Sequence, residues 1–457
     1  MHNVTRRNFL KATAAGASAV RALCEASPAR RPNIIVILAD DLGYSDVGFQ
    51  GCLDTPTPNV DRLVREGVRF SNGFVSHPYC SPTRAGLMTG RYQQRFGHEN
   101  NPRYDPKDEV AGLPVDQVTM PQVLAAAGYA TGIVGKWHLG AAPKFHPLKR
   151  GFKEQFGFIG GGHDYFKATP DYRREYLIPL ERDGKPVVEN EYLTDAFSRE
   201  AAAFIRRHRK EPFFLYLAFT APHTAAEAML QVSDRYLERV AGIEDEKRRK
   251  FAAMVNALDE GVGQVLSALE TTGLDSNTLV FFLSDNGGEM KVSAGTNRPL
   301  RGQKGEVYEG GIRVPFAARW CGRVPAGKVF ADPVISLDIF PTAAALAGAR
   351  LPAGLKLDGV DLMPYLAGRQ SSAPHDRLFW RTGGGAAFAV REGRYKLVRI
   401  GEQTELYDLE TDIGETKDIS ASHPEIVKKL DETREQWNRE LKAPLFENPR
   451  PAAKKNP

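Results

Sequence analysis

The nine residues NIIVILADD, positions 33–41, decide the fold class of this chain. Residues 33–39 are a continuous apolar run rich in β-branched side chains, which predicts a strand buried on both faces, as in a parallel sheet. Further strands are predicted at residues 129–134, 212–219 (PFFLYLAF) and 279–283. The core of the protein is therefore expected to be a sheet with covered faces.

Helical patterns fill the sequence between these strands. The predicted helices cover residues 58–66, ended by Gly67, residues 119–127, ended by Gly128, and residues 197–209 and 251–271. Strands that alternate with helices predict an α/β fold built on a largely parallel sheet. Such folds bind their ligands at the carboxyl ends of the strands.

Five polar residues fall where this rule places a binding site. Asp40 and Asp41 follow the first strand, Asp285 and Asn286 follow residues 279–283, and His223 follows residues 212–219. Adjacent carboxylates raise each other's pKa unless a cation neutralises them. Three carboxylates and an amide oxygen suit a hard divalent ion, with Ca²⁺ favoured over Mg²⁺ when the ligands come from distant loops. The alternative is that these residues only cap turns.

Residues 80–84 read Cys-Ser-Pro-Thr-Arg. Pro82 suits the first turn of a helix and Ser81 can cap it, which would place Cys80 at a helix N-terminus, where backbone N–H groups favour an anion. Arg84 lies one turn further on. The alternative for Cys80 is a small buried apolar side chain.

Lys136 and His138 end the run GYATGIVGKWH, residues 128–138. They are two residues apart, so on an extended segment both side chains point to the same side. A cation beside a titratable imidazole suits anion binding and proton transfer. Taken alone, His223 and Lys304 would be a surface loop histidine and a solvated charge.

The C-terminal part of the chain differs from the rest. Short strands are predicted at residues 377–381, 386–391 and 395–400, separated by glycine-rich turns, and a polar helix at about residues 424–441. This pattern predicts a smaller antiparallel subdomain at residues 369–447, after a catalytic domain at residues 31–368. The Pro- and Lys-rich residues 448–457 are expected to be a disordered tail.

The N-terminus has the pattern of a targeting segment. Thr5-Arg6-Arg7-Asn8-Phe9-Leu10-Lys11 resembles a twin-arginine signal, and a weakly apolar, Ala-rich stretch follows. Residues 1–30 are therefore excluded from the fold, and export by the twin-arginine translocase to the periplasm or medium is expected. The stretch is too short to anchor the protein across a membrane.

Composition narrows the classes of function that the chain could have. The chain has 457 residues, 26% of them charged, and a net charge of +5 without a dense basic stripe, which excludes a nucleic-acid-binding class and mildly suits an anionic substrate. Its four cysteines are too scattered for a disulfide framework. Cys52 and Cys321 are expected to be buried free thiols, although a bridge between them is possible.

The motifs together resemble the active site of the formylglycine-dependent sulfatases, the type I or arylsulfatase family of the alkaline phosphatase superfamily. The resemblance rests on C-x-P-x-R at residues 80–84, GYATGIVGKWH at 128–138, APH at 221–223, SDNG at 284–287, LRGQK at 300–304 and EGGIRVP at 309–315. It spans about Arg31 to the C-terminus. It implies a large mixed, mostly parallel sheet sandwiched by helices, with a smaller α+β C-terminal subdomain.

The resemblance also implies a role for each motif residue. A formylglycine-generating or anaerobic sulfatase-maturating enzyme would oxidise Cys80 to 3-oxoalanine, whose hydrate would be the nucleophile and one metal ligand. Covalent catalysis of this kind divides one hard displacement into two easier steps. The implied roles are as follows: Asp40, Asp41, Asp285 and Asn286 hold Ca²⁺, Lys136 and Lys304 bind sulfate oxygens, Arg84 stabilises the hydrate, His223 protonates the leaving alcohol, and His138 deprotonates the remaining hydroxyl, which expels sulfate.

The implied activity is hydrolysis of sulfate esters, on a sulfated sugar or polysaccharide since export favours an extracellular polymer. Polar loop clusters offer candidate sugar contacts at His98, Glu99, Asn100, His163 and Asp164. Two alternatives stay open: a phosphonate or phosphodiester hydrolase with the same aldehyde, and a non-catalytic glycan-binding protein in which Cys80 stays unmodified. The set Lys136, His138, His223 and Lys304 favours sulfate.

Overall fold

The computed structural model describes residues 30–167 and 175–448. The chain divides into two units, residues 1–31 and 32–457, and the helices and strands below belong to the second. The predicted twin-arginine segment and the predicted tail lie outside the described residues, except for Arg30 and Asn448. No helix among the described residues is both long and apolar enough to cross a membrane.

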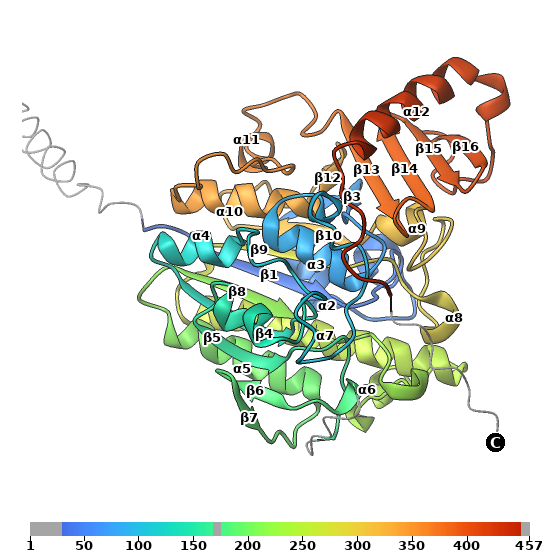
Figure 1. Ribbon diagram of the computed structural model, residues 1–457. Helices are drawn as coiled ribbons and strands as arrows, with labels where there is room; N and C mark the ends of the chain where they lie inside the picture. Colours follow the sequence, from blue (N-terminus) through green and yellow to red (C-terminus); the bar gives the residue numbers. More distant parts are fainter. Residues whose placement is uncertain (1–29, 168–174, 449–457) are drawn as a thin grey trace, which may run out of the picture. The chain divides into compact units, whose positions relative to one another are not determined.

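A ten-stranded sheet forms the centre of the second unit (Figure 1). Its middle strands are β9 (Thr278–Ser284), β1 (Asn33–Ala39), β8 (Phe213–Ala218) and β4 (Ala130–Lys136), which run parallel and are buried along their whole length. In this register Ile35 faces Leu215 on one side and Val280 on the other. The sheet predicted from the continuous apolar runs is thereby confirmed.

Shorter strands extend the sheet at both edges. Only β5 and β11 add parallel pairs there, while β10, β6 and β7 pair antiparallel, so the sheet is mixed. The edge strands are β2 (Val68–Phe70), β5 (Glu154–Phe158), β6 (Leu180–Arg182), β7 (Lys185–Val187), β10 (Phe316–Arg319) and β11 (Lys328–Phe330). Two further short strands, β3 (Gly73–Phe74) and β12 (Val334–Ile335), pair with each other.

Helices form two layers around this sheet. One layer consists of α3 (Cys80–Thr89), α4 (Met120–Ala126) and α10 (Ile339–Ala347); the other consists of α2 (Pro58–Arg65), α5 (Leu193–Arg207), α6 (Asp234–Arg239) and α7 (Glu246–Thr271) (Figure 1). Helix α7 begins five residues before the predicted start because Asp245 caps it by accepting the Arg248 N–H. Three one-turn helices lie in the loops: α8 (Met290–Ser293), α9 (Glu309–Ile312) and α11 (Met363–Leu366).

The C-terminal subdomain is a four-stranded antiparallel sheet with one helix packed on it. Its strands are β13 (Arg377–Thr382), β14 (Ala387–Glu392), β15 (Tyr395–Ile400) and β16 (Gln403–Asp408), covered by α12 (Pro424–Asn438). The last strand was not predicted, because QTELYD is polar and only three of its residues are buried. Trp380 of β13 connects this sheet to the part of the chain that holds the ten-stranded sheet, since its indole N–H donates to the Val75 carbonyl over 2.7 Å.

Two expectations are corrected by the structure. Cys52 and Cys321 are free, as expected, but both are half-buried rather than buried. Ser81 does not cap a helix, because α3 already begins at Cys80 with Tyr79 as its N-cap residue. The Ser81 hydroxyl instead donates to the His138 carbonyl over 2.6 Å.

Candidate active site

The polar residues that follow the central strands meet at one edge of the sheet. Asp40 and Asp41 follow β1, Asp285 follows β9, and Lys136 is the last residue of β4. Parallel strands end at the same edge, so residues far apart in sequence come together there. Asp41 adopts the left-handed conformation (φ 63°), and its N–H donates to Asp285 Oδ1 over 3.2 Å. A strained backbone at this position is typical of a functional site.

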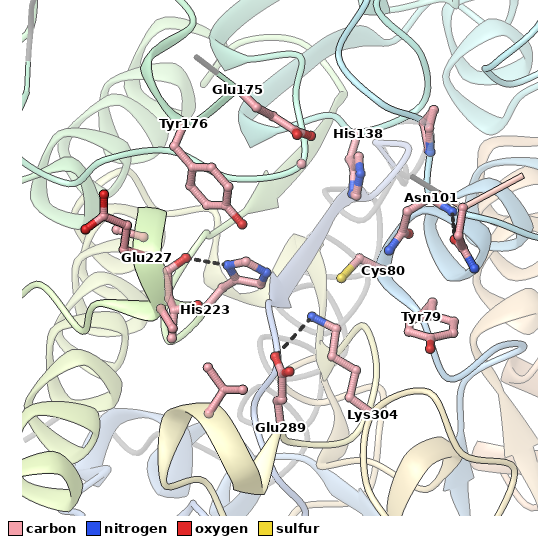
Figure 2. Close-up of a pocket in the computed structure, with 17 residues that line it drawn as sticks. Tyr79, Cys80, Asn101, His138, Glu175, Tyr176, His223, Glu227, Glu289 and Lys304 are labelled. Carbon is pink, nitrogen blue, oxygen red and sulfur yellow. Dashed lines mark hydrogen bonds and ion pairs between the residues drawn. The ribbon is translucent and has the colours of Figure 1, made fainter. Parts of the chain in front are cut away.

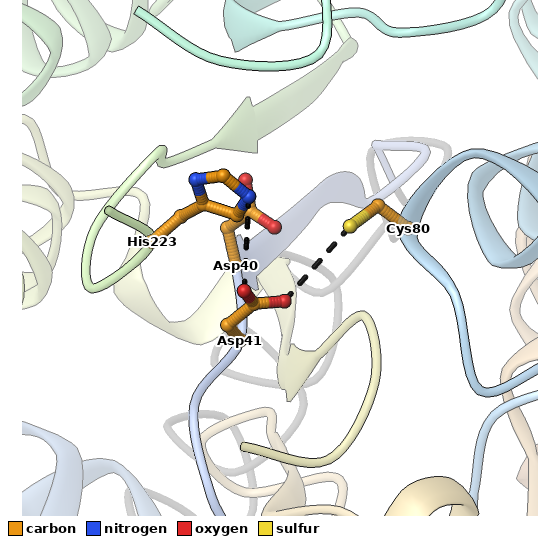
Figure 3. Close-up of side chains that lie close together, drawn as sticks. All are labelled: Asp40, Asp41, Cys80 and His223. Atoms are coloured by element: carbon orange, nitrogen blue, oxygen red, sulfur yellow. Dashed lines mark hydrogen bonds and ion pairs between the residues drawn. The ribbon is translucent and has the colours of Figure 1, made fainter. Parts of the chain in front are cut away.

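Four side chains form a tight cluster at this edge (Figure 3). Potential ligand atoms of Asp40, Asp41, Cys80 and His223 all lie within 4.8 Å of one another, and all four residues are buried. Asp41 Oδ1 is 3.9 Å from Cys80 Sγ, and Asp41 Oδ2 is 3.7 Å from His223 Nε2. The two adjacent carboxylates of this cluster repel each other unless cations lie nearby.

Two oxygens, one in the cluster and one beside it, lack the partners that buried polar atoms normally have. Asp40 Oδ1 and Asn286 Oδ1 are buried without a hydrogen-bond partner among the described residues. Asn286 is oriented by its amide nitrogen, which donates to Asp41 Oδ1 over 2.8 Å. Unpaired buried oxygens beside ionised carboxylates fit a hard divalent cation. The donor set is therefore suited to the ion that the sequence predicts.

Asp285 is held differently from the other carboxylates. Its Oδ2 accepts both Arg84 Nε, over 3.0 Å, and Arg84 Nη2, over 2.7 Å. It is not a member of the 4.8 Å cluster, although its Oδ1 is near the Asp41 backbone. Burial and the neighbouring Asp40 raise the pKa of Asp285 to about 6, against the opposing effect of Arg84. Arg84 thus orients a predicted metal ligand in this structure.

Two lysines neutralise the adjacent aspartates. Lys136 Nζ donates to Asp40 Oδ2 over 2.6 Å, and Lys304 Nζ donates to Asp41 Oδ2 over 2.7 Å. Burial alone would raise the pKa of Asp41, but the Lys304 ammonium and the hydrogen bonds from Lys304 and Asn286 hold that pKa well below its usual range. Asp41 is therefore ionised at neutral pH. Both lysines contact carboxylates that a divalent cation would also contact.

Cys80 lies in the first turn of the ten-residue helix α3. Its side chain is almost fully buried, with 2% exposed. Burial raises the pKa of the Cys80 thiol well above its usual value, although Lys136 and Lys304 oppose the shift. At neutral pH the unmodified residue is a neutral thiol, which is a poor nucleophile.

The two histidines each present one ring nitrogen that no protein group occupies. His223 Nδ1 donates to the Thr224 carbonyl over 2.7 Å, which leaves Nε2 for the cluster. His138 Nδ1 is buried without a hydrogen-bond partner among the described residues. Burial lowers the pKa of His223 to about 3 and that of His138 well below its usual value. Both are neutral imidazoles here, able to accept a proton.

His138 reaches the site by a different route from the predicted one. Strand β4 ends at Lys136, and His138 adopts a left-handed conformation (φ 58°) rather than the predicted extended one. Trp137 between them is buried and donates its indole N–H to the Phe145 carbonyl over 2.8 Å. The turn at residue 138, and not strand alternation, therefore points the imidazole at the site.

A cavity of about 500 Å³ opens above Cys80 (Figure 2). Cys80, His138, His223 and Lys304 line it, as their predicted roles require. The sequence did not indicate the other polar lining residues, which lie in loops and in single 3-10 turns: Tyr79, Asn101, Glu175, Tyr176, Thr224, Glu227, Glu289 and Asn448. Of these only Tyr79 and Thr224 carried a signal, their positions beside Cys80 and His223. The volume suits a small polar substrate rather than a single ion.

The five candidate sugar contacts do not line this cavity. All are buried and bonded within the protein. Glu99 forms an ion pair with Arg381 over 2.6 Å, and both ring nitrogens of His163 contact main-chain carbonyls. The others likewise serve the fold: His98 contacts Ser81 Oγ, Asn100 donates to the Phe446 carbonyl, and Asp164 accepts the N–H groups of Phe166 and Lys167.

Comparison with known proteins agrees with this geometry. The family model Sulfatase matches residues 32–349, and the model for the C-terminal part of N-sulphoglucosamine sulphohydrolase matches residues 303–440. N-acetylgalactosamine-6-sulfatase of Canis lupus familiaris is 37% identical over 388 residues, which cover 80% of this chain and 71% of that protein. Arylsulfatase A of Bos taurus is 39% identical over 402 residues, covering 82% and 75%.

Solved structures are similar over nearly the whole chain. Ps i-CgsB, solved in complex with k-i-k-neocarrahexaose, is 40% identical with a TM-score of 0.86, covering 92% of this chain and 95% of that one. The PsFucS1 sulfatase from Pseudoalteromonas sp. is 25% identical with a TM-score of 0.78, covering 93% of each chain.

Proposed function

The chain belongs to the sulfatase family and hydrolyses sulfate esters, and we propose that its substrate is an O-sulfated sugar or polysaccharide, attacked through a formylglycine made from Cys80. The observation that carries the proposal is the cluster of Asp40, Asp41, Cys80 and His223 at the floor of a polar cavity. Two of the relatives named above support a sugar substrate: one is named an N-acetylgalactosamine-6-sulfatase, and Ps i-CgsB was solved in complex with k-i-k-neocarrahexaose.

Conversion of Cys80 to formylglycine is supported by its chemistry in the folded chain. An unmodified thiol with a raised pKa is a poor nucleophile, whereas the hydrated aldehyde supplies a hydroxyl oxygen able to attack sulfur. Because the side chain is almost fully buried, a formylglycine-generating or anaerobic sulfatase-maturating enzyme would have to act on it before the chain folds.

The metal that we propose is Ca²⁺, with Mg²⁺ as the less suitable ion. Asp40, Asp41, Asp285 and Asn286 would hold it together with residue 80, and two of these residues have an oxygen without a partner. When bound, the ion polarises the attacking oxygen and offsets negative charge on the sulfate. Oxygen ligands drawn from separate loops favour the larger and less demanding ion.

The remaining residues bind the sulfate group and move protons. We assign Lys136 and Lys304 to the sulfate oxygens, since their ammonium groups lie at the cluster and become available once a cation shares the aspartates. Arg84, fixed by Asp285, supports the hydrate at residue 80.

The two histidines have opposite tasks in this proposal. His223 Nε2 would deliver a proton to the leaving ester oxygen, because the negative charge of a bound sulfate raises the pKa of this imidazole. His138 Nδ1 would take the proton of the remaining hydroxyl on residue 80, which releases sulfate. General acid and base steps of this kind contribute about 10²- to 10⁴-fold each.

We further propose that the protein is exported by the twin-arginine translocase and acts in the periplasm or the medium. The proposal is supported by the Arg6-Arg7 motif of the N-terminal segment. A location outside the cytoplasm gives access to sulfated polymers that do not enter the cell.

The test compares a panel of substrates, using protein produced with a formylglycine-generating enzyme. We expect turnover of 4-nitrophenyl sulfate and of at least one O-sulfated sugar, and loss of both activities in Cys80→Ala without loss of folding. Faster turnover of bis(4-nitrophenyl) phosphate would favour the phosphodiester hydrolase. Sugar binding without turnover, with residue 80 modified, would favour the glycan-binding protein.

A further inference from the structure

The last described residues of the chain return from the C-terminal subdomain to the active site. Residues 442–448, the C-terminal strap, follow α12 and run alongside residues 94–101 near α3 (Figure 1, dark red). Backbone hydrogen bonds fix the strap there: the Lys442 N–H donates to the Gln94 carbonyl over 3.0 Å, and the Leu445 N–H donates to the Gly97 carbonyl over 2.9 Å.

Side chains hold the strap as well. The Asn100 amide donates to the Phe446 carbonyl over 2.7 Å, and the Phe446 ring meets the His98 ring edge-on, with centroids 5.1 Å apart. Gly97 allows this close approach, because a Cβ at that position would lie 2.7 Å from the Ala443 carbonyl oxygen. The strap is therefore a docked part of the fold and not a loose end.

The strap delivers Asn448 to the cavity above Cys80. Asn448 Oδ1 accepts the Asn101 N–H over 3.0 Å, and Asn101 Oδ1 accepts the Ser81 N–H over 3.0 Å. Both asparagines line the cavity. Because each carbonyl oxygen is used, each side chain keeps its NH₂ group, which has no partner within residues 30–167 and 175–448.

The facing wall of the cavity has the opposite character. Glu175, Tyr176 and Glu227 lie across from Asn101 (Figure 2). Carboxylates accept hydrogen bonds, whereas amide NH₂ groups donate them. Sugar hydroxyl groups do both, so a pyranose ring between these walls would find acceptors on one side and donors on the other.

We propose that the C-terminal strap forms one wall of a sugar subsite, in which the Asn448 amide donates to an oxygen of the sugar that carries the sulfate ester. On the facing wall Glu227 accepts from a hydroxyl of the same sugar. This inference rests on the proposed function, because the subsite is useful only if a sulfate ester is presented to residue 80. Asn448 is thus a specificity residue supplied from outside the catalytic domain.

The test distinguishes recognition of the sugar from recognition of the sulfate group. Asn448→Ala and Asn448→Asp are compared with wild type on 4-nitrophenyl sulfate and on the O-sulfated sugar that wild type hydrolyses fastest in a panel. The aspartate variant keeps the acceptor for the Asn101 N–H but loses the NH₂ donor. Asn190→Ala, which removes an exposed asparagine that does not line the cavity, is the matched control.

We expect kcat/KM for the sugar to fall about three- to tenfold in both Asn448 variants, mainly through a higher KM. This factor corresponds to the loss of one hydrogen bond. Turnover of 4-nitrophenyl sulfate should change less than about twofold, as in Asn190→Ala. Equal losses on both substrates, or an aspartate variant that behaves as wild type, would overturn the inference. So would a wild type that hydrolyses the aryl ester but no sulfated sugar; failure on both substrates would instead refute the proposed function.

Discussion

Replacing Lys396 by methionine should destabilise the contact between the C-terminal sheet and the segment that carries Lys304. Lys396 is fully buried, and its ammonium lies 2.9 Å from Glu309 Oε1 and 2.8 Å from Glu415 Oε1. Glu415 Oε2 in turn accepts the Glu309 N–H at the start of α9. The substitution removes the cation that the two carboxylates share.

The structure sets the size of the effect. Removing one partner of a buried ion pair costs about 3–5 kcal/mol, because the remaining charge stays buried without compensation. Glu309 keeps Arg313 at 3.2 Å, which favours the lower end of this range. For a chain of 457 residues, about 1 kcal/mol corresponds to about 1 °C, so Tm should fall by about 3–5 °C.

The loss should also depend on pH. Burial raises the pKa of Glu415 from 4.5 to about 7, although Lys396 opposes the shift, and the variant raises it further. A carboxyl group whose folded pKa lies above its unfolded pKa destabilises the fold when ionised, and this penalty disappears as the pH falls through the folded pKa. The difference in Tm between wild type and Lys396→Met should therefore become smaller as the pH is lowered from about 8 to about 5.5.

Thermal unfolding at both pH values measures this prediction. The control is Lys429→Met, which removes a 62% exposed lysine from an ion pair with Glu392 and should change Tm by less than about 1 °C. A Lys396→Met protein as stable as this control would refute the reasoning. A difference in Tm that becomes larger as the pH falls would refute it as well.

Three further predictions concern the site. His223→Gln should lower kcat on a sugar sulfate about 10²- to 10⁴-fold but spare 4-nitrophenyl sulfate, whose leaving group needs no proton; equal losses would exclude the general-acid role. Chelation of Ca²⁺ should abolish turnover and lower Tm. Adding Ca²⁺ at about 100 times its Kd should raise the free energy of unfolding by about 2.7 kcal/mol. A chelated protein with full activity would contradict the metal proposal. Gly287→Ala places a Cβ 1.8 Å from the Gly310 carbonyl oxygen, so it should weaken Ca²⁺ binding at least about tenfold, whereas Gly242→Ala meets open space and should not; equal affinities would contradict this.

The central strands were predictable because burial on both faces leaves a continuous apolar run. The bounds of β1 were predicted to the residue, and β8 and β9 within one residue at each end. Edge strands lack this signal: β7 is three residues long, contains Pro186 and is largely exposed. Pairing with a neighbour, and not local composition, makes such a segment a strand.

The same contrast applies to the site. Asp40, Asp41 and Asp285 could be assigned because they directly follow strands whose ends must meet. The cavity wall could not be predicted, since Asn448 lies beyond the last helix and is held by Asn101, a contact between residues 347 positions apart. The Ser81 cap was wrong because α3 begins one residue earlier, at Cys80, and the Ser81 hydroxyl donates to the His138 carbonyl, 57 positions away.

The most direct test of the mechanism is the mass of the tryptic peptide of residues 70–84, taken from active protein produced with a formylglycine-generating enzyme. The mechanism predicts a peptide in which an aldehyde oxygen has replaced the Cys80 sulfur. An intact thiol in protein that hydrolyses 4-nitrophenyl sulfate would contradict the central claim, because the nucleophile would then lie elsewhere.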